Sequence, residues 1–233
     1  MRLGQTRAFG RDLESVEIIM ALKFLVSAGP TREYIDPVRF LSNPSSGKMG
    51  FAVAREAIKR GYECVLVSGP VNLKPPKGCK YIPVVSAEDM YQALKKEFNN
   101  CDVLIMTAAV SDFKPAKKLK QKEHKIAEKS ILELVRTKDI LKSLSPDKGK
   151  RTIVGFAAET EDMEASAKRK LFVKGLDMIV ANDVSKPLAG FASGKLNAAF
   201  LYPKKEKERL GLISKAAVAR KLIDFAEQEA KKK

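Results

Sequence analysis

The 233-residue sequence contains no tryptophan, one histidine and three cysteines. The lone histidine, His124, does not make a Ser/His/Asp system by itself, and nothing else resembles a covalent nucleophile with a paired base. Cys64, Cys79 and Cys101 are odd in number and lack CxxC spacing. Two of them lie beside strand-like runs, so we expect buried thiols rather than a disulfide or a zinc site.

Long apolar runs are absent as well. No run approaches the roughly 18 apolar residues that a membrane span needs, and residues 1–21 mix arginine and glutamate among apolar positions, unlike a signal peptide. We therefore expect a cytoplasmic protein that does not enter a membrane. With 45% hydrophobic residues the chain is able to bury a core. We expect one domain over residues 23–233, preceded by an N-terminal helical extension over residues 1–22.

Acidic residues are too few to balance the basic ones. The 44 Lys and Arg against 28 Asp and Glu give a net charge of +16, which suits an anionic partner or a solvated basic surface. The basic segments lack interleaved aromatic residues, and no recognition helix or RNP-type motif is present, so we expect no binding to nucleic acid. A small polyanion such as a nucleotide triphosphate is a simpler anionic partner for this charge than a nucleic acid.

Short apolar runs alternate with amphipathic stretches along the chain. The runs have the pattern of strands buried on both faces, at residues 23–29, 63–70, 101–110, 151–159 and 175–183, with 80–85 and 197–203 as further candidates. Helices are expected at residues 47–60, 86–99, 138–144, 160–174 and 214–231. Ser86 and Asp89 have the spacing of a capping box. The alternation predicts an α/β fold with a doubly wound, mainly parallel, Rossmann-like sheet.

Small and polar residues follow the expected strands, in SAGPTREYIDPVR, SGPV, TAAVSDF, FAAETED and ANDVS. Turn chemistry alone explains some of them. Sheets of this kind bind ligands beyond the carboxyl ends of their strands. Five such loops at one edge therefore predict a functional site there.

The stretch RFLSNPSSGKMGFAVAREAIKRG places many polar groups where a helix is expected to begin. Ser45, Ser46 and Gly47 present backbone N–H groups at a helix start, and Lys48 adds a full positive charge, which suits phosphate or carboxylate. Neither the P-loop spacing nor G-x-G-x-x-G is present. Ordinary helix capping would explain the serines, but not Asn43 and Lys48 beside them.

Four segments in order carry a specific resemblance over about residues 23–202: SAGPTREYIDPVRFLSNPSSGKMGFAVAREAIKRGYECVLVSGPV, AAVSDFKP, VGFAAET and KLFVKGLDMIVANDVS. The chain resembles phosphopantothenoylcysteine synthetase, which joins L-cysteine to 4′-phosphopantothenate in coenzyme A synthesis. The resemblance implies activation of the substrate carboxylate by CTP as an acyl-cytidylate, with Mg²⁺ carried on the nucleotide and no dedicated metal site. It also implies a homodimer. In many prokaryotes this synthetase is fused to a flavin-dependent decarboxylase, so a separate decarboxylase is a further candidate partner.

The resemblance implies roles for individual residues. Asn43 is expected to be catalytic by handling the acyl-cytidylate. Substrate binding is expected from Gly29, Ser45, Ser46, Gly47 and Lys48. Nucleotide binding is expected from Met106, Thr107, Ala108, Asp112, Lys138, Asp139, Ile140, Leu141, Phe156, Lys170 and Lys174. For Phe156 a plain core position is the alternative, and for Lys170 and Lys174, at i and i+4, it is a solvated basic face.

A lysine-rich flap over the phosphates departs most from the family pattern. The family usually has a K-x-K-K run, whereas KIAEK here keeps only the first lysine and the isoleucine. Lys125 is expected to be the catalytic flap lysine, with Lys129 or the KKLKQK cluster as substitutes. Residues 114–129 hold seven lysines and almost no apolar side chains, so we expect them to be disordered until an anion binds.

A short-chain dehydrogenase-like NAD(P) enzyme is the alternative on the same kind of sheet. Tyr91 and Lys95 supply a Y-x-x-x-K pair. That pair precedes the CDVLIMTAAV strand, whereas such enzymes place theirs later, and the glycine fingerprint is missing.

Overall fold

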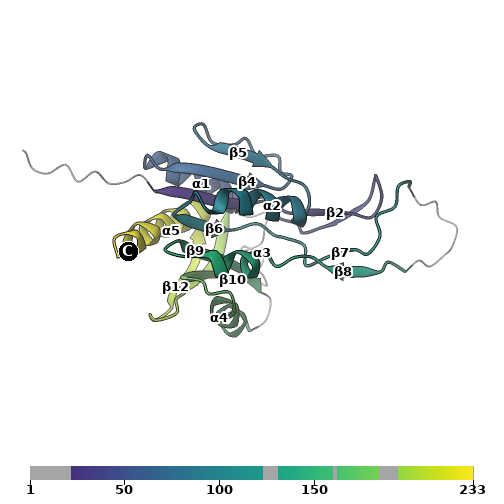
Figure 1. Cartoon of the computed structure of the whole chain (residues 1–233). Coiled ribbons are helices and arrows are strands. Elements are labelled where there is room, and N and C mark those ends of the chain that lie inside the picture. The colour runs from purple at the N-terminus through teal and green to yellow at the C-terminus, as the bar shows by residue number, and fades with distance from the viewer. Residues whose placement is uncertain (1–21, 123–130, 160–161, 184–193, 233) are drawn as a thin grey trace, which may run out of the picture.

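The computed structural model describes residues 22–122, 131–159, 162–183 and 194–232, and its centre is an eight-stranded sheet (Figure 1). The strands are β1 (Lys23–Ala28), β4 (Glu63–Ser68), β5 (Lys80–Pro83), β6 (Val103–Met106), β9 (Thr152–Glu159), β10 (Met178–Asp183), β11 (Lys195–Leu201) and β12 (Glu208–Ser214). Their order across the sheet is β12-β11-β10-β9-β6-β1-β4-β5. Neighbours from β10 to β5 in this order are parallel, and β11 and β12 are antiparallel. The expected mainly parallel sheet is confirmed.

Helices cover both faces of this sheet, which confirms the doubly wound prediction. Helices α1 (Lys48–Lys59) and α5 (Lys215–Ala230) pack on one face. The other face carries α2 (Ala87–Phe98), α3 (Ile140–Leu144) with a following 3₁₀ turn, η1 (Ser145–Asp147), and α4 (Met163–Val173). The capping box predicted before α2 is present: Asp89 N donates to Ser86 Oγ at 3.1 Å, and Ser86 N donates to Asp89 Oδ2 at 2.9 Å.

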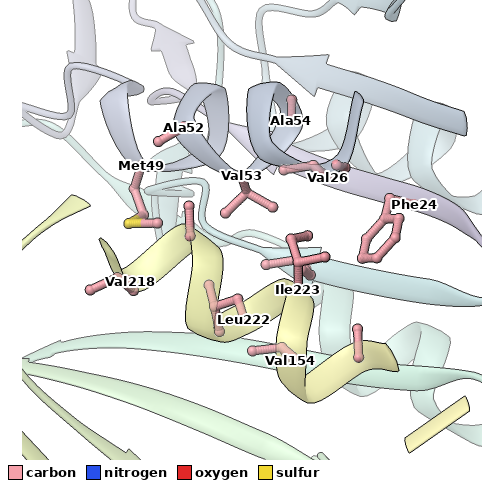
Figure 2. Packing of buried hydrophobic residues seen from close by; sticks show 14 of the residues in the cluster. Phe24, Val26, Met49, Ala52, Val53, Ala54, Val154, Val218, Leu222 and Ile223 are labelled. Atoms are coloured by element: carbon pink, nitrogen blue, oxygen red, sulfur yellow. The ribbon is translucent and has the colours of Figure 1, made fainter. Parts of the chain in front are cut away.

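An apolar seam joins α1 to α5 above the sheet (Figure 2). Val53 on α1 and Leu222 and Ile223 on α5 are fully buried over Val26 of β1. Burying a side chain of this size contributes about 1.5–3 kcal/mol. The seam therefore holds the two helices together as one layer.

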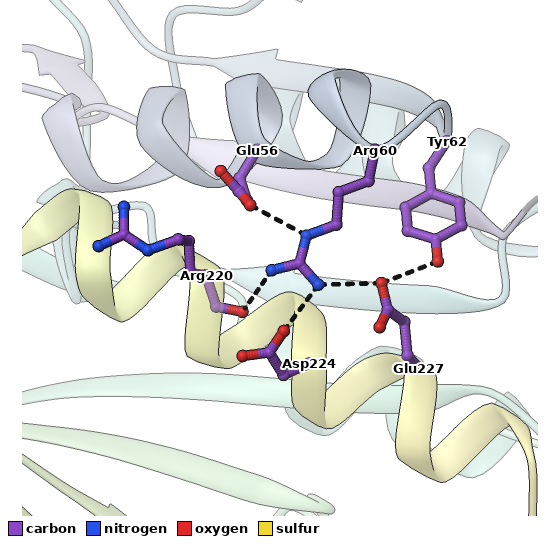
Figure 3. Close-up of polar contacts among 6 residues, drawn as sticks. All are labelled: Glu56, Arg60, Tyr62, Arg220, Asp224 and Glu227. Carbon is purple, nitrogen blue, oxygen red and sulfur yellow. Dashed lines mark hydrogen bonds and ion pairs between the residues drawn. The ribbon is translucent and has the colours of Figure 1, made fainter.

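A polar cluster at the far end of the same two helices adds to this contact (Figure 3). The Arg60 guanidinium, just after α1, donates to Asp224 at 2.7 Å and to Glu227 at 3.0 Å, both on α5. It also donates to Glu56 at 2.9 Å, and the Tyr62 hydroxyl donates to Glu227 at 2.8 Å. Figure 3 shows α1 and α5 running in the same direction, so their N-termini lie at the same end.

Three sets of strands were not predicted from the sequence. The chain forms one hairpin from β2 (Arg32–Tyr34) and β3 (Phe40–Ser42) and another from β7 (Phe113–Pro115) and β8 (Leu134–Arg136). The third is β12, which pairs with β11 through a register shift between Ala198 and Ala199. Each hairpin strand has only three residues, too few to show a hydrophobic period.

The two hairpins together form an arm, defined here as residues 32–42 and 113–122 with 131–136, which extends from the sheet (Figure 1). Leu119 N donates to Ile35 O at 2.8 Å, and the Lys118 ammonium lies 5.3 Å from the Tyr34 ring centroid. The predicted disorder of residues 114–129 is therefore wrong for 114–122, because strand pairing and a cation–π contact hold them. Lys125, Lys129 and the extension over residues 1–21 lie outside the described residues.

The three cysteines are free thiols, as expected. Cys64 and Cys101 are buried, but Cys79 is only partly so, which corrects the prediction for that residue. Within the described residues, no helix combines the length and apolar character that crossing a membrane would require.

Candidate functional site

A cavity of about 910 Å³ lies beyond the carboxyl ends of the parallel strands. It is lined by the N-terminal residues of α1, α3 and α5, by the segment after β6, by β9 and by α4. Of the described residues to which the synthetase resemblance gives a role, only Gly29 and the KKLKQK cluster, the substitute for Lys125, are not part of its lining. The structure thus brings the predicted site residues together, while their individual roles stay predictions.

The start of α1 forms one wall of the cavity. Gly47 is its N-cap with φ 73°, a left-handed conformation that favours glycine, and an added Cβ there would lie 2.9 Å from Val71 Cγ1. Gly47 has no side chain to cap the helix, and its backbone N–H donates to Ser45 Oγ at 3.4 Å. Ser45 and Ser46 also line the cavity, so local capping and a role at the site both fit these serines.

Gly29 lies directly behind this wall. Its Cα is 3.5 Å from the position that a Cβ on Gly47 would take, and its carbonyl accepts from Ala109 N at 2.9 Å. Its φ is 71°, and an added Cβ would meet Gly69 O at 2.9 Å. In this structure Gly29 supports the wall of the cavity rather than lining it.

Asn43 connects two loops at the cavity. Its Nδ2 donates to the carbonyl oxygens of Ala109 and Val110, each at 3.2 Å. These two bonds orient the amide, because they direct its NH₂ group at the segment after β6. An oriented neutral amide suits a reaction in which charge develops next to it.

The segment after β6 is held to β1 by its own polar groups. Thr107 Oγ1 donates to Ser27 O at 2.6 Å, and Ala108 N donates to Ser27 Oγ at 3.2 Å. Met106, Thr107 and Ala108 all line the cavity, and so does the exposed Asp112. The backbone N–H of Thr137 donates to Asp112 O at 2.9 Å, which joins this segment to the one before α3.

The α3 and α4 side of the cavity is strongly basic. Lys170 and Lys174 of α4 line it with Arg169, whereas Lys168 does not. The ammonium of Lys174 pairs with the Asp139 carboxylate at 3.0 Å, and the Lys138 ammonium lies 3.9 Å from the Tyr91 ring centroid. The basic residues of α4 are therefore not equally exposed, because Lys170 and Lys174 are half-buried at the cavity whereas Lys168 is exposed.

Apolar residues that line the cavity also belong to the core. Ile140 and Leu141 are 3% and 9% exposed. Phe156 on β9 is half-buried and packs against the α1–α5 layer while it lines the cavity. For Phe156 the core and pocket interpretations both fit.

The lining also contains residues that were not predicted, among them the polar side chains of Arg136, Thr137, Arg169, Asn182 and Lys215. Lys215 is only 7% exposed. Burial, and then the charge of Lys48, lower the pKa of Lys215 to about 8. The sequence indicates where α5 begins, but not that antiparallel β12 returns the chain to the cavity.

The pair proposed for a dehydrogenase lies elsewhere. Tyr91 belongs to α2, is 8% exposed and packs in the core. The ammonium groups of Lys138 and Lys95 lie over its ring. Neither Tyr91 nor Lys95 lines the cavity. The structure gives no support to this alternative.

A doubly wound, mainly parallel sheet with a cationic cavity beyond its carboxyl ends defines a Rossmann-like α/β protein whose site is built for anions. Residues 19–229 match the family described as "DNA/pantothenate metabolism flavoprotein C-terminal domain". The chain belongs to this family, and the resemblance to phosphopantothenoylcysteine synthetase is confirmed at that level.

Named relatives and a solved structure agree with this assignment. The chain is 45% identical over 200 residues to the "Coenzyme A biosynthesis bifunctional protein CoaBC" of Bacillus subtilis, covering 85% of this chain and 49% of the relative. The protein of the same name from Vibrio cholerae is 42% identical over 216 residues, covering 91% and 54%. A crystal structure of the C-terminal domain of such a protein superposes with a TM-score of 0.78 at 40% identity, covering 91% of this chain and 97% of that one. The chain spans about half the length of the curated relatives it matches.

Proposed function

We propose that this chain is the ligase that joins L-cysteine to 4′-phosphopantothenate in coenzyme A biosynthesis, with CTP as the activating nucleotide, in the cytoplasm. One observation carries the proposal. A single cavity joins the oriented Asn43 amide and the α1 N-terminus to the lysines of α4. The relatives named for coenzyme A biosynthesis support the same pathway.

The chemistry needs two steps, because a carboxylate oxygen is not a leaving group. The substrate carboxylate attacks the α-phosphorus of CTP, and pyrophosphate leaves with the electrons of the broken P–O bond. The amine of cysteine then attacks the acyl carbon of the cytidylate, loses a proton and displaces CMP. The chain's task is to position the reactants and to neutralise charge.

The cavity offers groups for each part of this reaction. In this proposal Asn43 contacts the acyl phosphate, and the α1 N-terminus with Lys48 contacts the acid substrate; all of them line the cavity. Lys170, Lys174 and Lys138 would neutralise the triphosphate. Lys125 remains our proposal for the flap lysine that closes over the phosphates.

The base is read by carbonyl groups in this proposal. The N–H groups of Thr107 and Ala108 already donate to Ser27 O and Ser27 Oγ. Contacts to a base would then come from their carbonyl oxygens, which accept from the exocyclic amine of cytosine or of adenine. A preference for CTP over ATP therefore depends on the shape around Phe156 rather than on these acceptors alone.

Mg²⁺ belongs to the same proposal as a companion of the nucleotide. The described residues contain no group of three or more His, Cys, Asp or Glu that could form a metal cage. The cavity carboxylates among them are Asp112 and Asp139, and Asp139 is already paired with Lys174. The ion would be held mainly by phosphates and water and would offset charge on the triphosphate, and Asp112 is the cavity carboxylate that could contact it.

A pyrophosphate-release assay tests the function. We expect release that requires 4′-phosphopantothenate and is fastest with CTP when each nucleoside triphosphate is supplied in turn with Mg²⁺. Addition of L-cysteine should yield the ligated product and CMP. Pyrophosphate release that ignores 4′-phosphopantothenate would contradict the proposal.

The arm supports the proposed homodimer because it carries exposed apolar side chains. The exposed set on or beside its two hairpins is Val38, Phe40, Phe113, Ile131, Leu132, Leu134 and Val135. Ile131 is 97% exposed. Apolar surface gathered in this way marks a protein interface, and we propose a second copy of the chain as its partner. Two arms paired in this way would bring one copy close to the other's cavity.

Leu134→Asp is expected to convert the dimer to a monomer, because it places a charge in the apolar surface of the arm. Analytical ultracentrifugation of both proteins measures the change. Leu212→Asp is the matched control, since Leu212 is 49% exposed on β12, away from the arm. A wild-type protein that sediments as a monomer at micromolar concentration would rule out the proposed dimer.

A separate flavin-dependent decarboxylase is the remaining proposed partner. The curated relatives are named bifunctional, and the chain matches about half of their length. The decarboxylation of the product would then be performed by another domain or chain.

A further inference from the structure

Lys48 and Lys215 occupy equivalent positions in two neighbouring helices. Each is the first residue of its helix, α1 or α5, and both line the cavity. Lys215 is 7% exposed and close enough to Lys48 for their charges to repel.

The fold holds these two positions side by side. Met49 and Val218 lie at the same end of the apolar seam in Figure 2, one residue and three residues after the two lysines. At the other end of the helices Arg60 bonds to Asp224 and Glu227. With both ends of the helix pair fixed, the backbones of Lys48 and Lys215 are held close to one another.

Two ammonium groups near one another at the wall of one cavity repel each other, and both are placed where an anion in the cavity is attracted to them. Burial first, and then the charge of Lys48, lower the pKa of Lys215 to about 8, so the group is still mainly protonated at neutral pH. The N-termini of α1 and α5 add partial positive charge at the same place. A dianion between the two ammonium groups would remove the repulsion.

The α1–α5 pair is separate from the other basic part of the cavity. Lys170 lies on α4 and Lys174 is the C-cap of that helix, which packs on the opposite face of the sheet. The cavity thus offers two cationic regions. In the proposed reaction there are two strongly anionic groups, the triphosphate of the nucleotide and the phosphate monoester at the far end of the acid substrate. A monoester has a second pKa of about 6 and carries nearly two charges at neutral pH.

We propose that Lys215 and Lys48 together bind the phosphate monoester of the acid substrate, apart from the triphosphate site on α3 and α4. This inference rests on the proposed ligase function. It assigns Lys215 as a specificity residue that distinguishes the phosphorylated acid from its unphosphorylated form.

Titration calorimetry with two ligands tests the assignment. Pantothenate lacks only the phosphate of 4′-phosphopantothenate, so the comparison isolates the proposed contact. For Lys215→Met we expect the dissociation constant of 4′-phosphopantothenate to rise about tenfold or more, with those of pantothenate and CTP unchanged. Lys215→Arg keeps the charge and should retain most of the affinity. Lys221→Met is the control, because Lys221 lies on α5 outside the cavity and pairs with Glu208 at 2.7 Å.

Each outcome separates this site from the ligase itself. Equal affinity of wild type and Lys215→Met for 4′-phosphopantothenate, or an equal loss for pantothenate or CTP, would overturn the phosphate site. Should Lys215→Met fail to fold, Lys48→Met is measured in its place and is expected to show the same selective loss. A wild type that binds 4′-phosphopantothenate through Lys215 but releases no pyrophosphate would refute the ligase and keep the site. If the wild type makes the ligated product while Lys215→Met binds 4′-phosphopantothenate normally, the ligase function stands and the phosphate site is refuted.

Discussion

Asn43→Asp is expected to lower turnover about 100-fold or more and to make the acyl-cytidylate accumulate. The added carboxylate would lie beside the acyl phosphate, where its negative charge repels the tetrahedral oxyanion that forms when cysteine attacks. Formation of the cytidylate should be less affected, because the nucleotide is bound mainly by the α4 lysines in our proposal. Rapid-quench analysis of the cytidylate and of the final product measures the two steps separately.

The contacts of Asn43 give this substitution a second effect. The Asn43 amide nitrogen donates to the carbonyl oxygens of Ala109 and Val110, each at 3.2 Å. An aspartate has no donor for these two acceptors, and its oxygen would face them with like charge. We therefore expect the new carboxylate to turn away from the carbonyl oxygens of Ala109 and Val110, so that it loses the orientation that the amide has in the native protein.

A matched control separates the local charge from the general effect of an added carboxylate. Asn100 is exposed in the turn after α2, and Asn100→Asp should leave both steps unchanged. Normal turnover in Asn43→Asp would remove Asn43 from the mechanism.

The main sheet and its helices could be predicted from sequence because their patterns are long or strongly marked. Strand β1 is a continuous apolar run that is buried on both faces, as the pattern of a central parallel strand requires. Helix α2 begins at a capping box, whose two residues are three positions apart and therefore visible in sequence. Such signals are local, and the structure confirms them.

The arm and β12 could not be predicted because their stability is not local. A three-residue strand such as β7 shows no period, and it forms only because β8 and the β2–β3 hairpin pack beside it. Strand β12 has no buried residue, because each of its side chains is exposed or only half-buried, and it contains Gly211 at φ 59°. Seven lysines suggested a disordered segment, but the backbone pairing of residues such as Leu119 depends on a partner distant in sequence.

The candidate site was predictable where it rests on strand ends and on family motifs. Asn43, Lys48 and Asp112 lie in such segments and do line one cavity. Lys215 could not be predicted as a site residue, because its place at the cavity depends on two antiparallel strands after β10 and on the packing of α5 against α1. A single lysine at a helix start carries no sequence signal of that arrangement.

The α4 lysines give the second large expected effect. Replacing Lys170 or Lys174 with Gln should weaken CTP binding by roughly 1–3 kcal/mol, which is about fivefold to 150-fold, if each makes a charge-assisted contact with the triphosphate. Lys168→Gln is the matched control on the same helix, because Lys168 is exposed and does not line the cavity. Titration calorimetry with CTP and Mg²⁺ measures all three variants.

The two lysines should differ in their effect on the protein without ligand. Lys174 pairs with Asp139, the N-cap of α3, at 3.0 Å, and this half-exposed pair contributes at most about 1 kcal/mol. Lys174→Gln should therefore lower the melting temperature by no more than about 4 °C, whereas Lys168→Gln should leave it unchanged. Triphosphate binding would also compete with Asp139 for the Lys174 ammonium, so Asp139→Asn should strengthen rather than weaken CTP binding if α3 keeps its cap through the asparagine side chain. Unchanged CTP affinity in both Lys170→Gln and Lys174→Gln would leave these residues as surface charges and would move the search for the triphosphate site to Lys138 and Arg169.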